Sequence, residues 1–170
     1  NRIKLFQQEN KGAAAARNLG IENATGELIT FLDADDFWFP NHLEEIFKLY
    51  TDYPNCGIYT NRYFIKISNK KIIKPSYLPE VQNNFKGVLF DYFTASKTYR
   101  VGLTSAIAIP KSILQNDFIF NSEISSGQDL ELYTKIAIEK PVAINNLFTV
   151  EYNFSLDNQL SKTPISQKKL

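Results

Sequence analysis

Several residue types are scarce in this chain: among 170 residues there is no methionine, one cysteine, one histidine and one tryptophan. The single cysteine, Cys56, excludes an internal disulfide framework and suits a reducing compartment. No apolar run is long enough to span a bilayer, and no signal peptide is recognisable. The formal net charge of +1 provides no global attraction to nucleic acid or to an anionic membrane. We therefore expect a cytoplasmic protein that has no nucleic-acid partner.

The composition and the first residues bear on how much of a domain is present. Hydrophobic residues make up 44% of the chain and charged residues 22%, which is typical of one globular domain with its own core. The chain starts at Asn1 without a methionine, and residues 2–6 already alternate like a strand. We expect a fragment of a longer protein, with the first segment of the domain outside this chain.

The pattern of apolar residues and turn formers predicts strands that alternate with helices. The expected strands cover residues 2–7, 27–32, 57–67, 71–74, 101–109 and 142–150. The expected helices cover residues 13–24, 40–50, 85–94 and 127–139, with a short one from Pro110. The apolar run before Asp33 suits a strand that is covered on both faces of a parallel sheet. These elements predict an α/β fold with a mainly parallel sheet flanked by helices, in a single domain.

The expected helix at residues 40–50 carries a stripe of apolar side chains. Proline is welcome in the first turn of a helix, and Pro40 stands there. Leu43, Ile46, Phe47 and Tyr50 then recur at steps of three and four residues. This spacing predicts that these four side chains form the buried face of the helix.

An acidic cluster follows directly after the apolar strand at residues 27–32. In open α/β sheets, ligands bind outside the carboxyl ends of the strands, and this is where Asp33, Asp35 and Asp36 stand. Neighbouring carboxylates repel one another unless a positive charge lies between them, and a hard divalent cation supplies that charge. The alternative is structural, because Asp36 is also suited to cap the following helix.

Two stretches of the chain together resemble a known family. They are N-K-G-A-A-A-A-R-N at residues 10–18 and T-G-E-L-I-T-F-L-D-A-D-D at residues 25–36. In this order they closely resemble the family 2 inverting glycosyltransferases, which have the GT-A fold. A weaker match is S-G-Q-D-L-E-L-Y at residues 126–133, and the weakest comprises Tyr152 and D-N-Q-L-S at residues 157–161. The resemblance covers nearly the whole chain.

The resemblance implies a role for each matching residue. Asp33 is expected to contact the donor ribose and the metal shell, and Asp35 to bind the Mn²⁺ or Mg²⁺ ion that bridges the donor diphosphate. Arg17 is expected near the nucleotide, and Asp129 is expected to be the catalytic base. Gly12 either allows a close approach of the ligand or serves only as a turn residue.

The chain departs from the family pattern at identifiable positions. The family's first strand, its P-x-Y-N loop and the aspartate that reads uracil have no counterpart here. Gln128 stands at a glutamate position and Lys135 at an arginine position. Phe154 and Ser155 occupy the region of a closing histidine, and His42 is no substitute for it. These departures bear on the third metal ligand and on the acceptor contacts.

The resemblance implies transfer of a hexosyl or N-acetylhexosaminyl group from a nucleotide-diphosphate sugar, with inversion. The donor is expected to be UDP-linked and the acceptor a glycan or a lipid-linked saccharide. Residues 1–52 are expected to bind donor and metal and residues 53–153 to form the acceptor side, with residues 154–170 as a tail. Two alternatives are a metal-dependent nucleotidyltransferase on a similar sheet and an inactive module that binds sugar nucleotides.

Other polar residues also have a structural interpretation. Ser126 with Asp129 fits the capping-box pattern, so that Asp129 could cap its helix as well as act as a base. Trp38 could stack on a sugar ring or belong to the core. The lysines in the expected hairpin suit a solvated face, or contact with a phosphorylated acceptor or an anionic membrane surface. They are Lys66, Lys70, Lys71 and Lys74.

Overall fold

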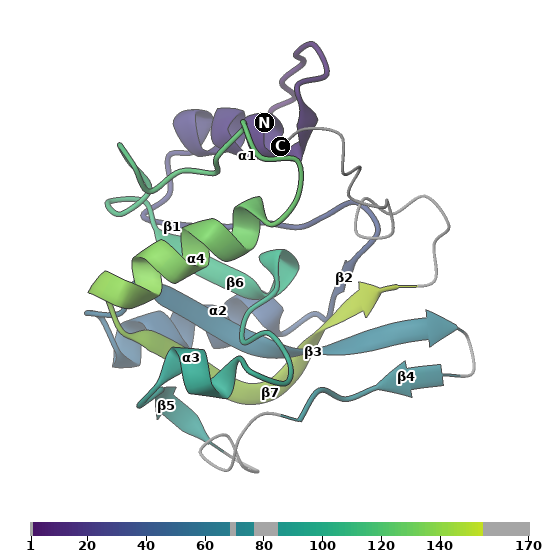
Figure 1. The fold of residues 1–170 in the computed structure, drawn as a ribbon, viewed down its shortest axis with the longest axis vertical. Helices are drawn as coiled ribbons and strands as arrows, with labels where there is room; N and C mark the ends of the chain where they lie inside the picture. Colours follow the sequence, from purple (N-terminus) through teal and green to yellow (C-terminus); the bar gives the residue numbers. More distant parts are fainter. Residues whose placement is uncertain (1, 69–70, 77–84, 155–170) are drawn as a thin grey trace.

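The computed structural model describes residues 2–68, 71–76 and 85–154 (Figure 1). The helices are α1 (Gly12–Asn23), α2 (His42–Asp52), α3 (Tyr92–Ala95) and α4 (Gln128–Glu139), and a 3₁₀ turn, η2, covers Thr104–Ala106. The strands are β1 (Leu28–Thr30), β2 (Phe37–Trp38), β3 (Ile58–Ser68), β4 (Lys71–Ile73), β5 (Lys86–Val88), β6 (Ile107–Pro110) and β7 (Val142–Asn153). The α/β class expected from the sequence is confirmed.

The strands form one mixed sheet in the order β1-β6-β3-β7-β2, with β4 beside β3 and β5 beside β7. Strands β3 and β7 are parallel, whereas β6 is antiparallel to both of its neighbours, β1 and β3. The expectation of mainly parallel pairing is therefore wrong: β6 enters between two strands that run the other way, and β2, β4 and β5 also pair antiparallel with their neighbours. This reversal places the turn before β6 beside the loop that leaves β1, since Thr30 pairs with Ala108.

Helices cover both faces of the sheet, and the strand residues alternate between two cores. In β6, Ile107 and Ile109 face a large core together with α4, while Ala108 faces a smaller core together with α2. In Figure 1, α4 crosses in front of the sheet, and the fainter α2 lies behind it. The α4 face is the one that carries the cavity described below.

Helix α2 buries a face that agrees only in part with the expected one, since Ile46 is buried as predicted. Leu43 and Phe47 are 53% and 62% exposed, whereas His42, Ile46 and Leu49 are buried against the sheet. The helix packs on β3 and β7 with His42 inside. The tertiary contacts therefore decide which apolar residues face the core.

Four expected elements differ in the structure. Residues 2–11 form no regular element, and Ile3 and Leu5 are each 84% exposed, because none of the described strands pairs with this segment. The helix expected at 85–94 is replaced by β5 and the short α3, which Asp91 caps by accepting from two backbone N–H groups. The expected strand at 101–109 begins only at Ile107, after η2, and no helix follows Pro110.

The hairpin and the later elements agree with the expectation. Strands β3 and β4 pair antiparallel, and α4 and β7 lie close to their expected ranges. Among the described residues, no helix is long and apolar enough to cross a membrane. The closing motif at 157–161, Lys70 and all of the tail except Phe154 lie outside the described residues.

Candidate functional site

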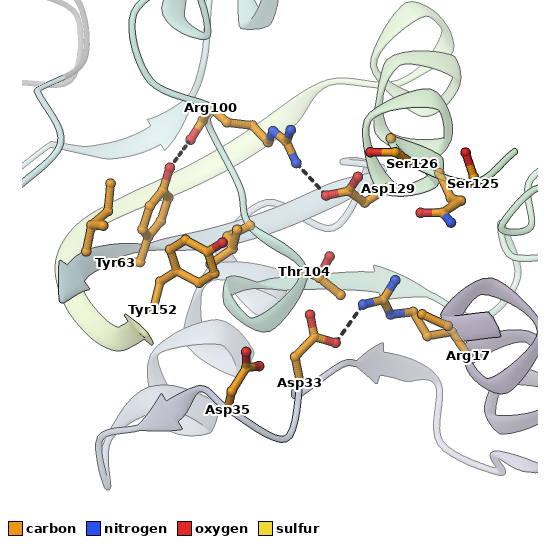
Figure 2. Close-up of a pocket in the computed structure, with 15 residues that line it drawn as sticks. Arg17, Asp33, Asp35, Tyr63, Arg100, Thr104, Ser125, Ser126, Asp129 and Tyr152 are labelled. Atoms are coloured by element: carbon orange, nitrogen blue, oxygen red, sulfur yellow. Dashed lines mark hydrogen bonds and ion pairs between the residues drawn. The ribbon is translucent and has the colours of Figure 1, made fainter. Parts of the chain in front are cut away.

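A cavity of about 540 Å³ opens on the α4 face of the molecule. Its walls come from the start of α1, the loop after β1, strand β3, the segment before η2, the start of α4 and the end of β7 (Figure 2). The polar lining residues are Arg17, Asp33, Asp35, Tyr63, Arg100, Thr104, Ser125, Ser126, Gln128, Asp129 and Tyr152. The structure thus brings together four of the five residues singled out from the sequence: Arg17, Asp33, Asp35 and Asp129.

Helix α1 aims Arg17 at the acidic loop. Its Nη2 donates to Asp33 Oδ1 over 2.6 Å, and its guanidinium lies 5.3 Å from the ring centroid of Phe120. The neighbouring Asn18 bonds to both the backbone N–H and the C=O of Phe120. The A-R-N sequence therefore fixes α1 to the loop before α4 and places a cation beside the first carboxylate.

The acidic loop is a tight turn, in which the Asp36 N–H donates to the Asp33 carbonyl over 3.1 Å. Asp33 and Asp35 line the cavity, whereas Asp36 turns inward. The Asp36 carboxylate accepts from the Ser105 hydroxyl and from the Asn153 N–H. Burial raises the pKa of Asp36 to about 6. Asp36 does not cap α2 as considered from the sequence, since the cap position belongs to Asn41.

Asp129 lies in the first turn of α4, across the cavity from the acidic loop (Figure 2). Its carboxylate is 16% exposed and forms an ion pair with Arg100. Gly127 holds the cap position with φ 84°, and no side chain bonds there, so the capping-box interpretation is wrong. Sequence reasoning missed Arg100, because nothing local marks an arginine whose partner is 29 positions away.

Gly12 stands apart from the other expected site residues. Its φ of 85° is left-handed, and its N–H donates to Asn10 Oδ1 over 3.1 Å. It is not among the residues that line the cavity. The turn interpretation therefore accounts for this glycine, and its contact with a ligand stays a prediction.

Trp38 and His42 belong to the interior rather than to the cavity. The Trp38 indole N–H donates to the Ser105 carbonyl, and its ring packs on His42 with 4.6 Å between centroids. His42 is completely buried, its Nδ1 bonds to the Thr149 hydroxyl, and burial lowers its pKa to about 4. The core interpretation of Trp38 is supported, and His42 is not placed to bind a cavity metal.

The two departures on α4 have local partners. Lys135 forms an ion pair with Glu131, one turn earlier on the same helix. Gln128 lines the cavity, while its side-chain amide donates to the Ile124 carbonyl. Lys135 does not line the cavity, which leaves Arg17 and Arg100 as its cationic lining residues among those described.

The chemistry of the acidic loop allows a test of its fit to a metal ion. Among the described residues, no group of three or more His, Cys, Asp or Glu side chains is arranged to hold a metal alone. Asp33 and Asp35, however, present two carboxylates to the same cavity from one turn (Figure 2). Mg²⁺ is commonly bound through one or two carboxylates plus substrate phosphates. The residues therefore fit a divalent ion whose coordination a phosphate ligand completes.

The family model described as glycosyl transferase family 2 matches residues 1–112. The chain belongs to this family. A glycosyltransferase of Rickettsia felis is 31% identical over 169 residues, which are 97% of this chain and 24% of that protein. The minor teichoic acid biosynthesis protein GgaA of Bacillus subtilis is 28% identical over 135 residues, covering 73% of this chain and 30% of GgaA.

Solved structures agree on the fold. TarS of Staphylococcus aureus, residues 1–349 in complex with UDP-GlcNAc, superposes with a TM-score of 0.72 at 15% identity. The match covers 93% of this chain and 43% of that one. The GT-A-like fold expected from the sequence is thereby confirmed. The chain spans about a quarter of the length of the Rickettsia relatives that it matches.

Proposed function

We propose that the cavity transfers a sugar from a nucleotide-diphosphate donor to an acceptor hydroxyl, with inversion at the anomeric carbon. One observation carries the proposal: Asp33 and Asp35 from one loop and Asp129 from α4 line the same cavity. Direct displacement at a sugar needs a leaving group on one side of the anomeric carbon and a base on the other. Figure 2 draws Asp33 and Asp35 on one side of the cavity and Asp129 on the other, and this arrangement supports such a displacement.

On the donor side, Asp33 and Asp35 would hold Mn²⁺ or Mg²⁺ against the diphosphate of the donor. Such an ion stabilises the charge that develops on the departing diphosphate. Arg17, paired with Asp33, lines the same wall and would provide a further positive group near the nucleotide. The TarS structure, which was solved with UDP-GlcNAc, supports a UDP-linked sugar as the donor class.

On the acceptor side, Asp129 would take the proton from the attacking hydroxyl. A carboxylate can do this when it lies within hydrogen-bond reach of that hydroxyl and is ionised. The Arg100 guanidinium pairs with this carboxylate and orients it at the cavity wall. The partly buried Tyr152 lines the adjacent wall, where its ring would face a saccharide.

The acceptor would be a glycan or a lipid-linked saccharide. The name of GgaA, a minor teichoic acid biosynthesis protein, supports a role in polysaccharide biosynthesis. A cytoplasmic location, with peripheral contact to a membrane that bears such an acceptor, belongs to the same proposal.

Kinetics of Asp129→Asn in the complete natural protein test the proposal. We expect turnover to fall about 100-fold or more, because asparagine cannot accept the proton. The KM for the UDP-sugar should be unchanged, since the base acts on the acceptor. Glu131→Gln, on the same helix but in the partly exposed pair with Lys135 outside the cavity, is the matched control and should turn over normally.

Normal turnover by Asp129→Asn would contradict the assignment of the base. Donor binding without any transfer by the wild-type protein would instead favour the inactive binding module. A product with retained anomeric configuration would contradict the inverting mechanism, whichever residue is the base.

A further inference from the structure

Ser105 lies between the acidic loop and the core without lining the cavity. It belongs to η2, and it is completely buried. The antiparallel pairing of β1 and β6 brings η2 beside the loop that leaves β1, although the two segments are about 70 positions apart. The hydroxyl and the backbone carbonyl of Ser105 both form hydrogen bonds with this loop and the strand that follows it.

Three hydrogen bonds connect Ser105 to the segment 33–38. The Asp33 N–H donates to Ser105 Oγ over 3.1 Å, and the same hydroxyl donates to Asp36 Oδ2. The Ser105 carbonyl accepts from the Trp38 indole N–H. One buried residue therefore bonds to the backbone N–H of Asp33, to the carboxylate of Asp36 and to the indole of Trp38, two residues further on.

The neighbouring residue connects the same turn to α4. Thr104 lines the cavity, and its Oγ1 accepts from the buried Tyr133 hydroxyl over 3.2 Å. Tyr133 lies one helical turn after Asp129 on α4. The turn η2 thus bonds to both walls of the cavity, through Ser105 on one side and Thr104 on the other.

We propose that Ser105 is a positioning residue, which holds the Asp33–Asp36 turn so that Asp33 and Asp35 face the cavity in the geometry that donor binding needs. The expected change in the donor KM rests on the proposed function, whereas the positioning of the turn by Ser105 does not. Side chains that bind a ligand act through fixed geometry, and displacements of about 1 Å can reduce rates about 100-fold.

The test uses Ser105→Ala in the complete natural protein. The variant removes one donated and one accepted hydrogen bond, and we expect the KM for the UDP-sugar to rise about tenfold at saturating Mn²⁺. Turnover at saturating donor should change less, because Asp129 is held by α4 and Arg100. Backbone amide exchange of Asp33, measured by NMR without donor, should become faster, since that N–H loses its acceptor.

Tyr59→Phe is the matched control. The buried Tyr59 hydroxyl also donates one hydrogen bond, to the Tyr53 carbonyl, and accepts one, from the Cys56 N–H, but none of these residues lines the cavity. Its loss should lower the melting temperature while the donor KM and the exchange of the Asp33 amide stay at their wild-type values. Asp36→Asn is a milder second variant: it leaves one carbonyl oxygen for the two donors, Ser105 and Asn153, and should raise the donor KM less than Ser105→Ala does.

The two readouts separate the failure of this inference from the failure of the proposed function. If Ser105→Ala leaves both the donor KM and the Asp33 amide exchange at the values of the Tyr59→Phe control, Ser105 has only a general structural role and the inference is wrong. If the amide exchange accelerates but the wild-type protein shows no dependence on a UDP-sugar, the turn is positioned as inferred and the proposed function fails.

Discussion

On the α4 face of the sheet charged side chains meet at an open cavity, whereas on the α2 face polar side chains are enclosed. Asp129 pairs with Arg100 at the cavity wall. Behind the sheet, His42 bonds to Thr149 and approaches Asn61, and all three are completely buried. The comparison teaches that a rare polar residue need not be functional: the only histidine supports packing, while an arginine without a local signature joins the site.

Arg100→Gln breaks the charged side of this comparison. The change removes the partner that orients the Asp129 carboxylate, and turnover should fall roughly tenfold to 100-fold, as for other misplaced reacting groups. Steady-state kinetics measure it. Lys135→Gln breaks a partly exposed ion pair on the same helix, outside the cavity, and should leave turnover unchanged. Equal losses in both variants would mean that charge on α4, rather than the pair with Asp129, controls the rate.

His42→Gln tests the other side of the comparison, the buried polar side chains on the α2 face of the sheet. The folded protein holds this imidazole neutral because its pKa is lowered to about 4 from 6.5, so the unfolded chain takes up the proton first as the pH falls. The contribution of neutral His42 to the free energy of unfolding is therefore full above pH 6.5 and is lost progressively as the pH falls towards 4. At about 1.4 kcal/mol per pKa unit, the loss approaches about 3 kcal/mol.

Urea unfolding of wild type and His42→Gln from pH 7.5 to pH 4 measures this contribution. The difference between the two proteins isolates His42, because other groups, Asp36 included, titrate in both. Parallel stability profiles would show that His42 is not held neutral by burial. The variant should keep its donor KM, since His42 does not line the cavity.

Gly57→Ala tests how closely α4 lies on the sheet and has the smallest expected effect. A Cβ at Gly57 would lie 2.5 Å from Ile136 Cγ2 and 2.6 Å from Lys140 Cβ. Overpacking of this kind lowers the free energy of unfolding by about 1–3 kcal/mol. Gly20→Ala in α1, where a Cβ meets nothing within 4 Å, should instead raise it by up to about 1 kcal/mol. Thermal melting distinguishes the two signs.

Local patterns predicted much of this molecule. Alanine-rich α1, the β3–β4 hairpin and α4 lie close to their expected ranges because their signals are contained within the elements themselves. The family resemblance named Arg17, Asp33, Asp35 and Asp129, which meet at one cavity. Periodicity failed where packing decides, as in the rotation of α2 and in the antiparallel course of β6.

The missed parts of the site depend on contacts between distant segments. Arg100 and Ser105 carry no motif, and their partners Asp129 and Asp33 lie 29 and 72 positions away. Asp36 was considered as a cap for the next helix because the local pattern allows it. In the folded chain its carboxylate instead joins η2 to the end of β7.

Calorimetric titration of the complete natural protein with UDP and Mn²⁺ most directly tests the central claim that one cavity separates a donor wall from a catalytic wall. For Asp35→Ala we predict that Mn²⁺-dependent binding of UDP is abolished, because one of the two carboxylates that face the diphosphate is gone. For Asp129→Asn we predict the wild-type affinity, because this carboxylate belongs to the opposite wall. Retained binding by Asp35→Ala, or its loss in Asp129→Asn, would contradict the account.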